Sequence, residues 1–483
     1  MSNDVRNLEP KSLWGNFADL NAVPRPSKKE EKVIAFAKNF GENLGLATIV
    51  DDIGNVIIKK PASAGMEDKP TVVLQSHLDM VHQKNAATQF DFDKEGIKMY
   101  VDGDWVRAKG TTLGADNGIG VASIMAILES SDIPHPAIEA LFTIDEETGM
   151  TGAKGLKGGL LDGSILLNLD TEDDDELTIG CAGGIDVEIT GKYEMENIDS
   201  NAITYKVSVK GLTGGHSGMD IYKGRANANK LINRLLYGAS KNYGIQINSI
   251  DGGGLRNAIP REANAIISVS NENDNALKQF IDEEKSIYAK EYATTDPALD
   301  IILEKTASTG NALSKAFQKD FLRAVYACPN GIYRMSPDME HVVQTSNNIA
   351  RILVGDGTYT VQCLTRSSVD SEKMDLGQTI KSAFTLIGAD VNLDGAYPGW
   401  TPKPEAAIIK MMRDLYKERY NEAPKVSSIH AGLECGILGT NYPDMDMISF
   451  GPNIRGAHSP DECCQISSVQ KYWGFLLEAL KRV

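Results

Sequence analysis

The chain has 483 residues, too many for one compact hydrophobic core, so we expect two or three domains. Hydrophobic residues make up 42% and charged residues 24% of the sequence, as in ordinary globular proteins. The net charge of −17 argues against nucleic acid or an anionic membrane surface as a partner. No apolar run approaches the ~18–20 residues that span a bilayer, and the charged start lacks the apolar segment of a signal peptide. These features predict a cytoplasmic protein.

The six cysteines show neither the CxxC spacing of a thiolate metal site nor a disulfide framework. A reduced, intracellular compartment is the simplest explanation. We interpret all six as structural thiols, although the fourth lies in a glycine-rich segment that could approach a site: Cys181, Cys328, Cys363, Cys435, Cys463 and Cys464.

The first third of the chain alternates predicted helices and strands. Ser27 and Glu30 have the spacing of a capping box, which predicts a helix that opens there and runs to about Leu44. A second, apolar helix is expected from Asp116 to Glu129. Apolar, β-branched runs predict strands buried in a core, at 47–50, 55–60, 71–76, 138–144 and 164–169.

The last part of the chain resumes this alternation, with a helix at 405–420, a strand at 447–450 and a helix at 467–481. Such alternation predicts an α/β fold with a mostly parallel central sheet and helices on both faces. We therefore expect one discontinuous catalytic domain, formed by residues 1–186 and 398–483.

Residues 187–397 differ in texture and predict an inserted α+β domain, in which alternating strands such as 204–210 indicate antiparallel pairing. Weak self-similarity suggests that this domain is duplicated. The first copy is predicted as strand 203–210, helix 225–237, strand 258–270, helix 274–291 and strand 298–304. The second is predicted as helix 311–327, strands 342–354 and 357–366, helix 370–387 and strand 389–395.

Metal-ligating side chains follow several predicted strands. His77 and Asp79 come directly after the run TVVLQS, and alternate residues of a strand point to the same side. A ligand histidine commonly has its second ring nitrogen held by a carboxylate, a role that suits Asp79. The alternative is a histidine in an ordinary polar loop.

Two further groups of carboxylates have competing interpretations. Asp116 lies in a glycine-rich segment before a helix, where it is either a metal ligand or an N-cap. Glu146 and Glu147 end a buried strand, where they are either a solvated acidic loop or a metal ligand beside a general base.

Asp170 ends another core strand, and His458 follows a strand in a Gly/Pro-rich loop near the C-terminus. Three successive strand–helix junctions therefore carry hard ligands, and the C-terminal part supplies a fourth. Mixed carboxylate and imidazole ligands suit Zn²⁺, Co²⁺ or Mn²⁺. The sequence lacks HExxH and GxSxG, which argues against a thermolysin-type site and a serine nucleophile. The acidic run 172–176 is interpreted as solvated surface.

The chain resembles the dinuclear zinc exopeptidase family, which includes glutamate carboxypeptidase, the aminoacylases, carnosinases and bacterial dipeptidases. The matching segments occur in the family's order across nearly the whole chain. Segments 24–28 (PRPSK) and 430–436 (HAGLECG), with the long insertion, most resemble the branch that cleaves Xaa-His dipeptides. The motifs that carry the family resemblance are SHLDM (76–80), GADNG (114–118), DEETG (145–149), NLD (168–170), GGHSG (214–218) and AHSPDE (457–462).

The resemblance implies two divalent metal ions, most simply zinc. His77, Asp116 and Asp170 would hold one ion. Asp116, Glu147 and His458 would hold the other, so that Asp116 bridges the two. The family often has a cis peptide after this bridging aspartate.

The resemblance also implies roles outside the ligand set. Glu146 would be the general base, and Asp79 would orient the first histidine ligand. In the inserted domain, His216 would stabilise the oxyanion, either within one chain or across a dimer. Asn257 and Arg366 match substrate-binding positions, and an arginine fork suits a substrate carboxylate.

The sequence thus predicts a metal-dependent dipeptidase that hydrolyses Xaa-His dipeptides and that could form a homodimer. We further expect Glu434 to bind the free α-ammonium of the substrate, although a structural role is an alternative. Another amidohydrolase of the family, such as a tripeptidase, carboxypeptidase or N-acyl amino acid deacylase, is the competing function. A non-catalytic binding protein on the same fold is more remote, because no ligand or base is missing.

Overall fold

The computed structural model describes residues 2–308 and 310–483, which form two compact units. Unit 1 comprises the residues up to Gly180, Trp400–Ser428 and Leu433–Val483. Unit 2 comprises Cys181–Gly399 and Ile429–Gly432. The predicted insertion at 187–397 has nearly the same ends as the main segment of unit 2, but it did not include the short second segment.

Unit 1 is built on an eight-stranded sheet whose four central strands are parallel. The outer pairs β1–β2, β2–β6 and β23–β8 are antiparallel. In sheet order the strands are β1 (Ala47–Val50), β2 (Val56–Lys60), β6 (Ile138–Thr143), β3 (Val72–His77), β7 (Ile165–Asn168), β23 (Asp446–Ser449), β8 (Glu176–Cys181) and β22 (Lys425–Ile429).

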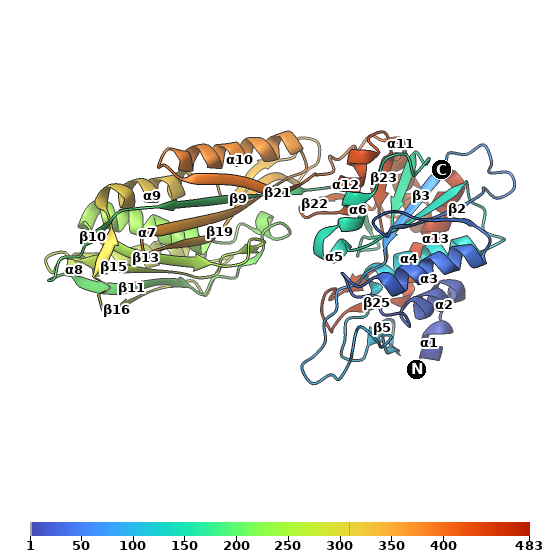
Figure 1. Ribbon diagram of the computed structural model, residues 1–483, viewed down its shortest axis with the longest axis horizontal. Helices are drawn as coiled ribbons and strands as arrows, with labels where there is room; N and C mark the ends of the chain where they lie inside the picture. Colours follow the sequence, from blue (N-terminus) through green and yellow to red (C-terminus); the bar gives the residue numbers. More distant parts are fainter. Residues whose placement is uncertain (1, 309) are drawn as a thin grey trace. The chain divides into compact units, whose positions relative to one another are not determined.

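Helices surround this sheet, and α4 is apolar on every side because it packs between β3 and α2. Helix α11 packs on β23 and on α13 (Figure 1). The helices of unit 1 are α1 (Ser2–Arg6), α2 (Lys11–Leu20), α3 (Glu31–Asn43), α4 (Ala115–Glu129), α5 (Glu146–Gly149), α6 (Thr151–Gly155), α11 (Ala407–Tyr420), α12 (Glu434–Asn441) and α13 (Ile466–Arg482). A small antiparallel sheet adds β24 (Ile454–Arg455), β25 (Cys463–Gln465), β5 (Trp105–Ala108) and β4 (Met99–Asp102).

The capping-box prediction at Ser27 was wrong. Helix α3 begins at Glu31, and its first turn receives no side-chain cap. The Ser27 hydroxyl instead donates to Asp79 Oδ2 at 2.8 Å, and Glu30 accepts from the backbone N–H of Lys28. A long-range partner has therefore replaced the local one that the spacing suggested.

Unit 2 is built on a nine-stranded antiparallel sheet, whose labelled strands run side by side in Figure 1. The strands along the sheet are β16 (Asp300–Lys305), β11 (Ile203–Lys210), β15 (Ala263–Val269), β13 (Gln246–Gly253), β19 (Val343–Gly355), β20 (Thr358–Ser367), β9 (Gly183–Lys192) and β21 (Asp390–Tyr397), with β18 (Gly331–Met335) paired to β19. Two short pairs are β10 (Met195–Asn197) with β17 (Asn311–Leu313), and β12 (Gly215–His216) with β14 (Ala258–Ile259).

Four helices pack their apolar faces against this sheet, where Val187 and Ile189 of β9 are buried and Glu188 is exposed. These helices are α7 (Ala228–Tyr243), α8 (Asp274–Glu291), α9 (Lys315–Ala327) and α10 (Asp370–Thr385), and a 3-10 turn, η1, covers Ile221–Lys223. The Asn227 side chain caps α7 by accepting from two backbone N–H groups of its first turn.

The duplication is visible in the strand order of unit 2. The segment β11–α7–β13–β15–α8–β16 is followed by α9–β19–β20–α10–β21, and β9 supplies the missing first strand of this second copy. The sheet then has the same strand order outward from its β13–β19 centre in both directions. The predicted second copy lacked its first strand, because β9 precedes the whole first copy in the sequence.

The ends of the main segment of unit 2 lie side by side. Strands β9 and β21 are paired, with Gly184 opposite Tyr397. A Cβ atom added to Gly183 would lie only 2.5 Å from the backbone nitrogen of Gly399, so glycine is required at this close approach.

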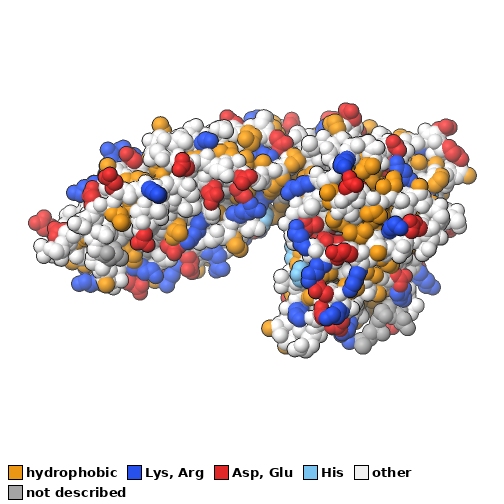
Figure 2. Space-filling model, in the orientation of Figure 1, with side chains coloured by type: hydrophobic (Ala, Val, Ile, Leu, Met, Phe, Trp, Pro, Cys, Tyr) orange, Lys and Arg blue, Asp and Glu red, His pale blue; other side chains and the backbone are white. Residues whose placement is uncertain are grey.

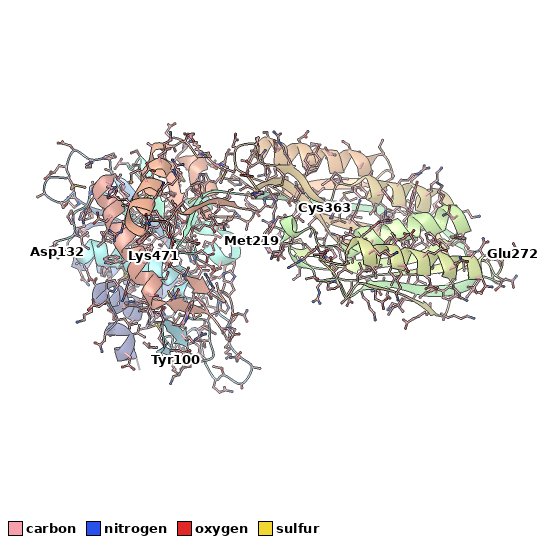
Figure 3. All side chains as sticks on the ribbon, turned by 180° about the vertical axis from the view of Figure 1, so that it is seen from behind. Tyr100, Asp132, Met219, Glu272, Cys363 and Lys471 are labelled. Atoms are coloured by element: carbon pink, nitrogen blue, oxygen red, sulfur yellow. The ribbon has the colours of Figure 1, made fainter. Side chains whose placement is uncertain are left out.

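Charges are paired over much of the described surface, and basic and acidic side chains are interspersed on the face shown in Figure 2. The interpretation of the acidic run 172–176 as solvated surface was wrong for most of the run: only Asp175 is exposed, Glu176 is buried, and three of the five carboxylates form ion pairs. Lys471 on α13, labelled in Figure 3, donates to Asp174 at 2.7 Å. Among the described residues, no helix combines the length and apolar character needed to cross a bilayer.

Candidate metal centre

The candidate site lies where three parallel strands of unit 1 end. Strand β3 ends at His77, β6 leads into Glu146 and Glu147 at the start of α5, and β7 leads to Asp170. Because parallel strands bring their carboxyl ends to one edge of a sheet, these side chains converge. The fourth contribution is His458, which follows β24.

Asp116 occupies the centre of the cluster. Its Oδ1 lies 3.1 Å from Nε2 of His77, and its Oδ2 lies 3.2 Å from Nε2 of His458. On one side, Asp170 approaches His77 Nε2 at 3.6 Å. On the other, Glu147 approaches His458 Nε2 at 3.0 Å. Two groups that share Asp116, each with its ligand atoms within 4.8 Å of one another, could therefore each hold a metal ion.

The backbone around Asp116 departs from helical geometry. Asp116 (φ −79°, ψ 111°) and Asn117 interrupt α4. The two carboxylate oxygens of Asp116 face His77 and His458, and no backbone N–H of the described residues is hydrogen-bonded to them, so the N-cap alternative for Asp116 does not hold. Gly114 has φ 71°, and a Cβ there would lie 2.6 Å from the guanidinium of Arg25. The peptide between Asp116 and Asn117 is cis, as the family resemblance implied.

Asp79 contacts both His77 and the turn that carries the two glutamates. Its Oδ1 lies 3.3 Å from Nδ1 of His77 and accepts from the backbone N–H of Glu146 at 3.0 Å. Its Oδ2 accepts from the N–H of Glu147 at 3.3 Å and from the Ser27 hydroxyl. Burial opposes ionisation of Asp79, yet these hydrogen bonds and the histidine lower its pKa. A charged Asp79 therefore connects the orientation of His77 to the turn that carries the two glutamates.

The electrostatics of the cluster fit a cation site. Burial raises the pKa of Glu146 and Asp170 well above the usual range, and burial and the charge of Asp116 raise that of Glu147. Contact with Asp116 and Glu147 raises the pKa of His458 to about 11. A carboxylate-rich, buried cluster therefore takes up protons unless another positive charge is present.

Glu434, the first residue of α12, contacts side chains of β3 and β6. Its Oε2 accepts from Gln75 Nε2 at 2.6 Å and from the Thr143 hydroxyl at 2.7 Å. Asn168 donates in turn to Gln75 Oε1 at 2.5 Å. Glu434 is fully buried, and its Oε1 has no hydrogen-bond partner among the described residues. Burial raises the pKa of Glu434 to about 7.

The predicted oxyanion-stabilising residue, His216, and the other two predicted substrate-binding residues, Asn257 and Arg366, lie in unit 2. His216 lies in β12, opposite Ala258 of β14, and Asn257 precedes β14. Nδ1 of His216 accepts backbone N–H groups from Gly218 and Met219 at 3.1 and 3.0 Å. In the neutral ring the proton therefore resides on Nε2, which makes this atom a donor. Burial and the charge of Arg366 lower the pKa of His216.

Arg366 of β20 is 5% exposed, and no carboxylate pairs with it among the described residues. Its guanidinium donates to the Tyr397 hydroxyl at 2.8 Å, and Nε has no partner in the described chain. His430, buried nearby, bonds to the Ser346 hydroxyl at 2.7 Å. Burial and the Arg366 charge lower the pKa of His430 to about 3, so the His430 ring is neutral beside this guanidinium.

Three residues of this architecture had no role in the sequence analysis: Arg25, His430 and Glu462. The first two belong to segments quoted for the Xaa-His branch, and Glu462 ends the segment AHSPDE. Motif membership was therefore the one signal available for them. Their long-range contacts could not be inferred from spacing.

Comparisons with known proteins show which family this chain belongs to. The model of the peptidase family M20/M25/M40 matches residues 73–482. The cytosol non-specific dipeptidase of Escherichia coli strain K12 is 42% identical over 480 residues, or 99% of each chain. The crystal structure of aminoacylhistidine dipeptidase from Vibrio alginolyticus has a TM-score of 0.95 and 44% identity, and covers 100% of this chain and 99% of that one. A tripeptidase structure from Staphylococcus aureus, with a TM-score of 0.56, 16% identity and 98% coverage of both chains, shows the same fold.

The comparisons confirm the family resemblance and the α/β fold with its inserted α+β unit. They also confirm a metal-dependent peptide-bond hydrolase. This chain therefore belongs to the peptidase family M20/M25/M40.

Proposed function

We propose that this chain is a cytoplasmic dipeptidase that hydrolyses Xaa-His dipeptides with the help of two divalent cations. The observation that carries the proposal is the position of Asp116, whose two carboxylate oxygens each face a different histidine. A single carboxylate placed in this way suits two cations that share one ligand. The names of two similar proteins, one non-specific and one aminoacylhistidine dipeptidase, support a dipeptide substrate but differ in breadth.

The described side chains fit such a centre. His77, Asp116 and Asp170 would hold one cation, and Asp116, Glu147 and His458 the other. The donor set of oxygen and imidazole nitrogen favours Zn²⁺, with Co²⁺ or Mn²⁺ as alternatives. When bound, such cations supply Lewis acidity that lowers the pKa of water and polarises a carbonyl.

Glu146 is the proposed general base. Its backbone N–H is held by Asp79, and burial raises the pKa of its side chain. Once ionised beside bound cations, a carboxylate with a raised pKa would take a proton from water more readily than an ordinary one. It would then deliver that proton to the leaving amine. Asp79 holds His77 in one orientation throughout.

The proposed substrate contacts come from unit 2 and from α12. Nε2 of His216 is a donor suited to the developing oxyanion. Arg366 is buried and has no carboxylate partner among the described residues, so it suits the carboxylate of the substrate, and Asn257 would be a further polar contact. His216 is predicted to act either within one chain or across a homodimer.

Substrate preference separates the proposal from its alternatives. We expect the zinc-loaded protein to cleave Gly-His and β-Ala-His and to lose this activity on chelation. The measurement is hydrolysis of these two peptides beside Gly-Leu, Gly-Gly-His and an N-acetyl amino acid. Equal cleavage of Gly-Leu would indicate a broad dipeptidase. Cleavage restricted to the tripeptide or the acylated compound would move the chain to another activity of the family.

Replacing the proposed base tests the mechanism. Glu146→Gln should lower kcat by about 100- to 10,000-fold, because an amide cannot take the proton. Metal content, measured by elemental analysis, should stay unchanged. The exposed Glu422 of the same unit provides a control, and Glu422→Gln should keep normal turnover. Near-normal kcat in Glu146→Gln would exclude this residue as the base.

Glu434 is proposed to bind the α-ammonium, on the evidence of its buried and unpartnered Oε1. Glu434→Gln should raise KM for dipeptides by about 10-fold or more, since a hydrogen bond to a charged group contributes roughly 1.5–3 kcal/mol. Steady-state kinetics of the variant on Gly-His provide the measurement. An unchanged KM would leave only a structural role in the network with Gln75 and Thr143.

Cation binding should release protons. The raised pKa values of His77 and His458 mean that both rings are protonated at pH 7 when no cation is bound. A ligand histidine must be neutral, so affinity should weaken as the pH falls. Calorimetric titration with Zn²⁺ in two buffers of different ionisation enthalpy would detect this release. Identical heats in both buffers would contradict it.

A further inference from the structure

The loop that leads to Asp116 is held by one buried carboxylate. Oε2 of Glu462 accepts from the backbone N–H groups of Leu113 and Gly114 at 2.7 and 2.9 Å. Oε1 accepts from those of Ala115 and Asp116 at 2.7 and 3.2 Å. Four consecutive amides therefore converge on one side chain that is more than 340 positions away in sequence.

Glu462 is 3% exposed, and no lysine or arginine forms an ion pair with it among the described residues. Burial raises the pKa of Glu462 to about 7, whereas the four backbone N–H groups favour its ionised form through charge-assisted hydrogen bonds, which belong to the stronger class. Only a carboxylate can accept on both of its terminal atoms. Glutamine would present an NH₂ group to two N–H donors.

A buried arginine side chain holds the opposite side of the same loop. Arg25 is 1% exposed, and its NH2 group donates to the carbonyl oxygen of Gly114 at 2.6 Å. Its NH1 group donates to the carbonyl oxygens of Leu78 and Asp79, both at 3.1 Å. The loop is thereby attached to the segment that follows His77.

Glu462 also belongs to the loop that carries His458, four residues earlier in the chain. The backbone N–H of Asp116 and the ring of His458 are consequently fixed by one short segment. A shift of Glu462 would alter the 3.2 Å approach between Asp116 Oδ2 and His458 Nε2.

We propose that Glu462 is a positioning residue that sets the separation of Asp116 and His458, two of the three ligands of the second cation. It acts through the four backbone amides, and Arg25 holds the other face of the loop in place. This inference rests on the proposed two-cation function.

The test is titration of Glu462→Gln with Co²⁺, whose visible absorption reports ligand geometry. We expect affinity to weaken by about 10- to 100-fold, the usual effect of losing a group that orients ligands. The absorption spectrum should change as well. Glu462→Asp, which keeps the charge but shortens the reach, should bind Co²⁺ more weakly than the unaltered chain. It serves as the test if the glutamine variant does not fold.

Glu139 offers a matched control. It is 2% exposed, and its Oε2 accepts from the backbone N–H groups of Asp162 and Gly163 at 2.8 and 2.9 Å. Unlike Glu462, it also forms an ion pair, between Oε1 and Lys59 at 2.7 Å. It lies near the start of β6, whereas the site follows the end of that strand. Glu139→Gln should therefore lower the thermal midpoint without changing the Co²⁺ affinity or spectrum.

The outcomes are distinguishable. Unchanged Co²⁺ affinity and spectrum in folded Glu462→Gln would overturn the inference, whatever the change in stability. Equal weakening in Glu139→Gln would also overturn it, because the effect would then be general destabilisation. If the unaltered chain binds no Co²⁺, Zn²⁺ or Mn²⁺, the proposed cation centre itself fails.

Discussion

The arrangement of unit 1 depends on one constraint, the crowding of buried carboxylates around Asp116. Burial raises the pKa of Glu147 and Asp170, and the negative charge of Asp116 raises both further. Such a cluster persists as anions only when positive charge is supplied. The two histidines provide part of that charge, and the geometry leaves each of them facing a different oxygen of Asp116. The chemistry of the site follows from this electrostatic requirement.

Rigid supports oppose the repulsion that this crowding produces. A buried row of hydrogen bonds crosses β7, β3 and β6 near the ligands. It is formed by the side chains of Asn168, Gln75, Glu434 and Thr143. Beside them, Asp79 holds the turn of the two glutamates. Each support joins residues that are distant in sequence. The position of the ligands is therefore a property of the folded sheet rather than of any local motif.

The sequence predicted much of this architecture because strand ends are visible as apolar runs followed by polar residues. The run before His77 and the run before Asp170 each end in a ligand, and both strands lie where they were expected. Local signals failed where a distant partner intervened. Ser27 has the spacing of a cap but bonds to Asp79. Residues 311–313 were predicted as helix but pair with β10, so that α9 begins at Lys315.

The roles of Glu462 and Arg25 were beyond sequence reasoning for the same physical reason. Each side chain forms hydrogen bonds with backbone atoms. Because nearly every residue type provides the same backbone groups, the sequence does not reveal which residues are the partners. A buried charge that is satisfied by amides or carbonyls is also indistinguishable, in sequence, from a solvated one. His430 is a similar case, since its neutrality depends on burial beside Arg366.

The close approach of Gly183 and Gly399 has a consequence for the assembly of the interrupted unit. Once unit 2 has folded, its entry and exit strands are neighbours in a β-ladder, roughly 5 Å apart. Unit 1 then has to close only a gap of hairpin width, because the entropic cost of closing a loop grows with its number of flexible residues and the residues of unit 2 are already ordered. For the assembly of unit 1, the folded insertion thus has the effect of a tight turn between two neighbouring strands. A side chain at either glycine would push the two ends of the insertion apart.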